Sequence, residues 1–154
     1  MLGAIGLAGC SQSAEGQGET NVEQREGELV PTPADNVSSG IPGRPVMVGY
    51  DGPQMDACGT ASKVVLVAGE EGDAAIVRSA PDVSAREVAQ IAPGHMVVQC
   101  DYSDENVWLG IVWDPTSPES PSCGTGSPVV EVQEYVGTCH SGWIRADNLE
   151  MVAG

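Results

Sequence analysis

Four cysteines in the C-terminal two thirds of the chain constrain its fold more than any other feature. They are Cys58, Cys100, Cys123 and Cys139. No two of them form a CxxC pair, so the spacing does not indicate a zinc ribbon or a thioredoxin-like redox motif. In an exported protein four cysteines are typical of two disulfides, and three pairings are open. The sequence therefore predicts a cross-linked protein from an oxidising compartment.

A fifth cysteine, Cys10, indicates where the chain works. It ends the segment Leu-Ala-Gly-Cys at residues 7–10, after an uncharged run. This segment resembles the lipobox of bacterial lipoproteins, which implies cleavage before Cys10 and a diacylglycerol on its thiol. No Lys or Arg precedes Cys10, whereas a signal peptide has a basic start. We therefore expect residues 1–10 to be part of a longer signal peptide, the alternative being an ordinary terminus with a chance cysteine. Ser11 in place of Asp favours, by the same resemblance, the outer membrane facing the periplasm.

Residues 11–49 differ in composition from the rest of the chain. They are rich in Gly, Ser, Glu, Gln and Pro and contain no aromatic residue. Such a segment cannot bury enough apolar area to offset its ordering entropy, so we expect a disordered linker. A chain of this length has a mean span on the order of 35 Å. The predicted layout is a lipid anchor, a flexible tether and one domain over residues 50–154; a folded 11–49 is the alternative.

The charge of the chain narrows the class of partner. Twenty-two acidic residues face six basic ones, a formal net charge of −16. Nucleic acids and anionic lipid head groups are bound through Lys and Arg, so we expect no nucleic-acid partner and no electrostatic membrane binding. Solubility, in a saline habitat for example, explains an acidic surface, and a docking face for a basic protein is the alternative.

Short β-branched runs between Gly- and Pro-rich turns dominate residues 50–154. The expected strands cover residues 64–68, 74–78, 88–91, 95–100, 107–113 and 142–145. No segment keeps a helical period over ten residues. Short strands at this spacing predict an all-β fold, a small barrel or sandwich. The chain has no Phe, so Trp108 and Trp143 are expected to be core anchors among Val, Ile and Leu.

Four segments resemble, in order, the bacterial SH3-like domain family. They are residues 75–81 (AIVRSAP), 91–97 (IAPGHMV), 108–112 (WLGIV) and 141–149 (SGWIRADNL), within core motifs spanning 74–152. The cysteine positions resemble a subgroup of exported proteins with such domains. The resemblance implies a small SH3-like barrel that binds ligands without catalysis. The chain differs from the pattern of this family at two places. Asp82-Val83 stands where the family frequently has Gly, and Asn148 stands where the family usually has an aromatic residue.

Residues 114–138 form an insertion rich in Pro, Ser and Gly, longer than a typical loop of that family. Pairing Cys123 with Cys139 would close this insertion onto the strand of Trp143. Pairing Cys58 with Cys100 would join the entry segment to a central strand. Local closure favours this pair of disulfides, and the other pairings stay open. The predicted fold is an SH3-like barrel with a disulfide-stapled loop insertion after a disordered tether.

The residues that could carry chemistry do not form a catalytic pattern. Cys139 and His140 are neighbours on an expected strand, so their side chains point to opposite faces. His95 and His140 have no partner at zinc-ligand spacing. The acids of the CDYSDEN stretch lack the EF-hand pattern. No GxSxG, HExxH or phosphate-loop motif occurs. We therefore expect no enzyme, no metal and no cofactor.

The aromatic residues near strand ends are the candidates for binding. Trp113 precedes Asp-Pro, so we expect it to be exposed, and Tyr102 and Tyr135 flank expected loops. A groove of these three residues could stack on an extended peptide or a glycan. The predicted function is a binding module of a cell-envelope lipoprotein that recognises cell-wall peptide or an envelope protein. The alternative is an accessory or inhibitor domain that docks a basic partner through its acidic surface.

Overall fold

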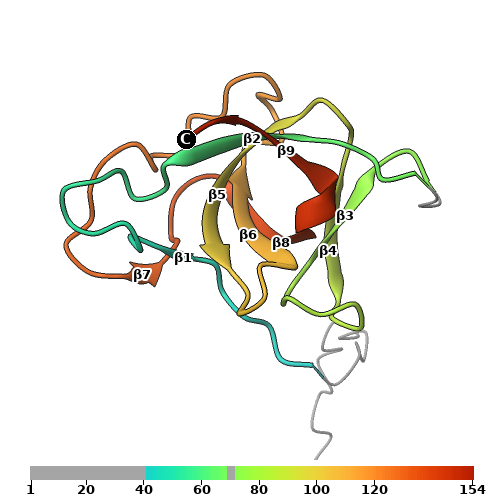
Figure 1. Ribbon diagram of the computed structural model, residues 1–154, viewed down its shortest axis with the longest axis horizontal. Coiled ribbons are helices and arrows are strands. Elements are labelled where there is room, and N and C mark those ends of the chain that lie inside the picture. Colours follow the sequence, from blue (N-terminus) through green and yellow to red (C-terminus); the bar gives the residue numbers. More distant parts are fainter. Residues whose placement is uncertain (1–40, 69–71) are drawn as a thin grey trace, which may run out of the picture. The chain divides into compact units, whose positions relative to one another are not determined.

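The computed structural model describes residues 41–68 and 72–154 of the chain (Figure 1). Cys10, the expected signal peptide and residues 11–40 of the expected linker lie outside this part. The described residues are all-β, as predicted, and contain one 3-10 turn, η1 (Ala146–Asn148). No helix among them is both long and apolar enough to cross a membrane.

Seven strands form one antiparallel sheet, and two further short strands form a second. The order in the large sheet is β4 (Glu87–Ile91), β3 (Ala75–Arg78), β8 (His140–Arg145), β6 (Trp108–Trp113), β5 (Met96–Tyr102), β2 (Thr60–Val64) and β9 (Leu149–Ala153). The small sheet pairs β1 (Met47–Val48) with β7 (Gln133–Glu134). Within the described residues β4 and β9 do not pair, so the large sheet is not a closed barrel.

The connections of the large sheet show that it is strongly curved. Strands β8 and β9 are four strand spacings apart in the sheet order, which is about 19 Å in a flat sheet. Only the 3-10 turn η1 joins them, and four residues of such a turn advance about 8 Å. The connection from β4 to β5 also spans four spacings, over residues 92–95, where His95 N–H donates to the Ala92 carbonyl at 3.3 Å. Both connections require the sheet to curl back on itself.

Most expected strands are present, and two differences have clear causes. The apolar run at residues 64–68 is not a strand; the strand is β2, which ends at Val64. Thr60 to Lys63 pair with β5, and beyond them Val65 N–H donates to the Asn148 carbonyl, at the start of β9. Strand β9 was not expected, because four of its five residues are exposed and it has no alternation to read.

Two apolar clusters pack on opposite faces of the large sheet. The strand cluster comes entirely from sheet strands and consists of Val64, Ala75, Val77, Ile91, Val97, Ile111, Trp113 and Ile144. The cap cluster consists of Val46, Val48, Ala57, Cys58, Cys100, Trp108, Val112, Cys123 and Trp143. Neighbours on one strand, such as Trp143 and Ile144, belong to different clusters because strand side chains alternate. The central strands of the sheet are therefore covered on both faces.

The second face is covered by residues 44–48, here called the strap. The sequence assigned these residues to the linker, but Val46 and Val48 are buried and Met47–Val48 form β1. Val46 lies over Gly110 of β6, where an added Cβ would meet Val46 Cγ1 at 3.1 Å. The folded part therefore begins before residue 50, because β6 offers a glycine on which the strap can lie.

Polar contacts fix the strap at both ends. Asp101 of β5 is buried, and its carboxylate accepts from Met47 N–H at 3.0 Å, from Tyr102 N–H at 2.7 Å and from the Arg44 guanidinium at 3.2 Å. The Arg44 guanidinium stacks on the Trp143 ring at 4.4 Å, and Trp143 Nε1–H donates to the Arg44 carbonyl at 2.8 Å. A buried carboxylate with three donors is satisfied, so the strap is a specific part of the fold.

Candidate functional site

Both predicted disulfides are present, and both belong to the cap cluster. Cys58 pairs with Cys100, with Cα atoms 4.6 Å apart, and Cys123 pairs with Cys139 at 5.3 Å. The first joins the segment before β2 to β5, and the second closes the insertion at the start of β8. Disulfides persist in oxidising compartments, which fits an exported protein.

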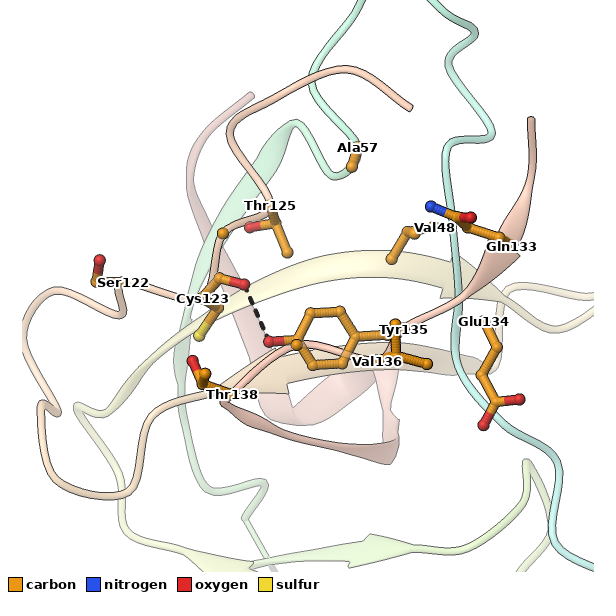
Figure 2. A pocket seen from close by; sticks show the side chains of 12 residues that line it. Val48, Ala57, Ser122, Cys123, Thr125, Gln133, Glu134, Tyr135, Val136 and Thr138 are labelled. Atoms are coloured by element: carbon orange, nitrogen blue, oxygen red, sulfur yellow. Dashed lines mark hydrogen bonds between the residues drawn. The ribbon is translucent and has the colours of Figure 1, made fainter. Parts of the chain in front are cut away.

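A hollow of about 440 Å³ lies on the insertion. We call it the insertion hollow. Its lining residues are Val48, Ala57, Ser122, Cys123, Gly124, Thr125, Gln133, Glu134, Tyr135, Val136, Gly137 and Thr138. Figure 2 shows the Tyr135 ring lying across the hollow with its hydroxyl directed at Cys123. Strand β1 of the strap and strand β7 of the insertion together form one side of it.

Tyr135 is the residue that holds the insertion hollow in shape. Its hydroxyl donates to the Cys123 carbonyl at 2.9 Å and accepts from Cys139 N–H at 3.1 Å. Its backbone N–H donates to the Val46 carbonyl at 2.9 Å. One side chain thus bridges the two cysteines of a disulfide, and its backbone extends the pairing to the strap. The hollow is therefore formed before any ligand arrives.

The walls of the insertion hollow suit a peptide backbone. Half of its lining residues are Gly, Ala, Ser or Thr, whose short side chains leave room for an extended chain. Glu134 adds one negative charge, and Val136 is 86% exposed at the rim. Extended peptides are recognised through main-chain hydrogen bonds, with nearby pockets for side chains. The hollow has room for such a peptide.

The three aromatic residues predicted to form one groove lie in different places. Trp113 is 3% exposed and belongs to the strand cluster, so its predicted exposure is wrong. Trp113 is the last residue of β6, and β6 pairs with β8 as far as this residue. The centroids of the Trp113 and His140 rings lie 5.5 Å apart. Tyr135 packs against the cap cluster on the opposite face. Of the three, Tyr135 alone lines the insertion hollow, while Trp108 and Trp143 are buried, as predicted.

Tyr102 lies at the exposed end of β5, where it packs against Tyr50 with ring centroids 5.5 Å apart. Burial and the negative charge of Asp101 raise the pKa of Tyr50 above its ordinary value. The phenol therefore stays neutral further into alkaline solution and keeps its hydrogen-bond donor. This tyrosine pair borders a hollow of about 140 Å³ beside the Cys58–Cys100 disulfide.

A second hollow, of about 180 Å³, lies over the sheet beside Trp108. We call it the arginine hollow. It is lined by Ala74, Ile76, Arg78, Val83, Trp108, Arg145 and Asn148. These arginines were not among the site residues predicted from the sequence. A signal was present, because only six of the 154 residues are Lys or Arg.

The titratable groups of the described residues do not cluster around a common point. Among residues 41–68 and 72–154, no three His, Cys, Asp or Glu side chains gather closely enough to hold an ion. The four cysteines there are held in disulfides. His95 Nε2 lies 3.0 Å from the Asp114 carbonyl, where the insertion begins.

No protein-family model matches the chain, and neither a curated protein nor a solved structure matches it significantly.

Proposed function

We propose that the chain is a non-catalytic binding module of a bacterial cell envelope, held to the membrane by a lipid on Cys10. Its folded part binds a cell-wall peptide or an extended segment of an envelope protein. The observation that carries the proposal is the insertion hollow. Tyr135 and the Cys123–Cys139 disulfide hold it open, and half of its lining residues have short side chains. A pre-formed site avoids the ordering cost that a flexible loop would incur on binding.

An SH3-like barrel is part of the proposal. Three of the segments that resemble the family occupy neighbouring strands: residues 75–81 contain β3, 141–149 overlap β8 and 108–112 lie in β6. The curvature required by η1 and by the β4–β5 turn supports a barrel-like sheet. The strap and the insertion are additions that bury the face of this sheet opposite the strand cluster.

The central experiment is sedimentation of the purified protein with isolated peptidoglycan. We expect the wild-type protein to pellet with it, and Val136→Asp to bind about tenfold more weakly, because a charge then stands at the rim of the hollow. Val130→Asp is the matched control: Val130 is 85% exposed on the same insertion but does not line the hollow. Equal binding by the two variants would place the ligand elsewhere.

A second candidate function follows from charge. Glu131 and Glu134 accompany the exposed Val130, Val132 and Val136 on the insertion, so this face is both apolar and acidic. Such a face would dock a basic protein, for instance as an accessory or inhibitor domain. Binding through charge falls as salt is added, whereas binding through the hollow persists. Sedimentation at 50 mM and 500 mM salt therefore separates the two functions.

The anchor has its own test. A mass measurement on protein extracted from membranes should show a chain that begins at Cys10 and carries acyl groups. It should also show no free thiol among the other four cysteines. A cytoplasmic, unacylated and reduced protein would remove the basis of the envelope assignment.

A further inference from the structure

The arginine hollow combines positive charge with apolar walls on a strongly acidic molecule. Residues 41–68 and 72–154 contain five Lys and Arg residues, and two of them, Arg78 and Arg145, line this one hollow. The other walls include the Trp108 ring and the half-exposed Ile76 and Val83. Solubility alone does not explain why scarce cations gather beside exposed apolar groups.

Sheet register places the two arginines side by side. Arg78 of β3 is paired with Trp143 of β8, and Arg145 of β8 is paired with Trp108 of β6. Paired residues share a face, and so do residues two apart on one strand. Arg78 and Arg145 are therefore diagonal neighbours, about 7–8 Å apart at the backbone. A group between them can accept hydrogen bonds from both guanidiniums.

This site lies where the cover of the cap cluster ends. Trp143 is fully buried under Arg44 of the strap, whereas Trp108 keeps 7% of its surface exposed, the most of the three tryptophans. The Arg145 guanidinium lies over the Trp108 ring at 5.9 Å. The half-exposed Arg145 guanidinium is thus available to a ligand, with the buried Trp108 ring behind it.

The local charges decide which ligand fits. Arg78 donates one N–H to the Ala85 carbonyl at 2.8 Å, which orients its guanidinium. Arg145 makes a long, exposed contact of 3.5 Å with Asp147, and exposed Glu87 is paired with Arg78 across β3 and β4. Exposed ion pairs of this kind contribute little, so a ligand carboxylate can replace Asp147 at Arg145.

From this geometry we infer that the arginine hollow binds the carboxylate end of a peptide. The carboxylate lies between Arg78 and Arg145, and the last side chain packs on Trp108 and Ile76. A volume of about 180 Å³ corresponds to roughly six water-sized groups, enough for one terminal residue and too small for a whole drug-sized ligand. The inference adds a second site to the proposed function. It rests on the proposed function only in taking the ligand to be a peptide.

The test uses a pair of acetylated pentapeptides, Ala-Ala-Leu-Ala-Ala, one with a free carboxylate and one with a C-terminal amide. Binding is followed by titration calorimetry and tryptophan fluorescence at 0.15 M salt, where distant carboxylates of the protein are screened. We expect the free acid to bind and to change the fluorescence, and the amide to bind about tenfold more weakly. Equal binding of the two peptides, or no binding of the acid, would overturn the inference. If inorganic phosphate displaced the peptide acid as effectively as the peptide acid itself does, the inference would also be overturned, because the site would then bind any anion.

Three variants assign the binding to this hollow. Arg145→Met should weaken binding of the acid about tenfold, and Arg86→Met, which removes the same charge from an exposed residue outside the hollow, should leave it unchanged. Asp147→Asn should strengthen binding a few-fold, because it removes the competing carboxylate. Unchanged affinity in Arg145→Met, or weaker binding in Asp147→Asn, would contradict the placement.

The two sites fail separately. If the protein pellets with peptidoglycan but does not bind the free peptide acid, this inference is wrong and the proposed function stands. If the peptide acid binds and the protein does not pellet, the carboxylate site stands and the cell-wall ligand is wrong.

Discussion

The strand cluster and the cap cluster lie on opposite faces of one sheet, yet they are built from different parts of the chain. All members of the strand cluster come from strands of the large sheet. The cap cluster needs residues of the strap, of the segment before β2 and of the insertion, and it includes three disulfide cysteines while Cys139 packs against it. Alternating strands can bury one face by themselves, but a second face needs a cover from elsewhere in the chain. Both proposed binding hollows lie on the face of the sheet that carries the cap cluster. The strap and the insertion cover only part of that face.

Reduction of the disulfides should have the largest effect on this comparison. In the chain-entropy model, a loop such as that closed by Cys58–Cys100 contributes about 4 kcal/mol and one such as that closed by Cys123–Cys139 about 3 kcal/mol. Their sum is comparable to the whole stability of a small domain. We expect urea denaturation with a reducing agent to show a much lower midpoint. The near-UV circular dichroism, to which Trp108 and Trp143 contribute, should be the first signal to weaken as urea is added. An unchanged midpoint would mean that the cap cluster is stable without its cross-links.

Truncation of one side chain in each cluster comes next. Ile144→Ala in the fully buried strand cluster should cost about 2–5 kcal/mol. Val48→Ala in the cap cluster removes fewer atoms and should cost about 1–2 kcal/mol. Chemical denaturation of both variants measures the difference. A larger loss for Val48→Ala would show that the cap, and not the strand cluster, limits the stability of the domain.

Asp101→Asn tests the strap alone. The amide replaces one carboxylate oxygen by an NH2 group that must face the donors of Met47, Tyr102 or Arg44. We expect a loss of about 2 kcal/mol, the typical cost of an unsatisfied buried group. Hydrogen exchange should speed up at Met47 and stay slow in the strand cluster. Uniformly faster exchange would show instead that the strap and the sheet unfold as one unit.

The smallest effect is expected at the turn after β6, which lies outside both clusters. The Thr116 hydroxyl and backbone N–H both donate to the Asp114 carboxylate, at 2.7 Å and 2.8 Å, and lower the pKa of Asp114 below its ordinary value of 3.8. This contribution is present above pH 3.8 and is lost as the pH falls through the lowered pKa. Thr116→Val should move the pKa back toward 3.8, as followed by NMR, with neither cluster affected. An unchanged pKa would assign the shift to the backbone donors alone.

Most of the large sheet could be predicted, and its cover could not. The strands β3, β4, β5, β6 and β8 overlap runs of β-branched residues between Gly and Pro turns, and local sequence carries that signal. The strap, β7 and β9 have no such signal. Strands β1 and β7 have only two residues each, β9 is mostly exposed, and such segments become strands only when a partner is present. The exposure predicted for Trp113 failed for a related reason: pairing with β8 continues to the end of β6 and buries the ring.

The features of the candidate sites also divide into those that local sequence predicts and those that it does not. The disulfide pairing was predicted from loop closure, and Tyr135 was recognised as a candidate from its place beside a loop. The insertion hollow itself depends on a hydrogen bond between residues 12 apart and on a strap that precedes it by about 90 residues. The arginine hollow depends on the register of three strands. Neither relation is visible in a linear pattern.

The amino-acid sequence by itself determined the all-β class and the acidic character and favoured the observed pair of cross-links, because β-branched runs, charge and cysteine spacing are properties of neighbouring or countable residues. Only the tertiary structure decided which residues cover the second face of the sheet and where that cover leaves the two arginines accessible beside the buried Trp108. The reason is physical: burial of a sheet face is set by segments far apart in the chain, whose contacts exist only after the sheet has curled.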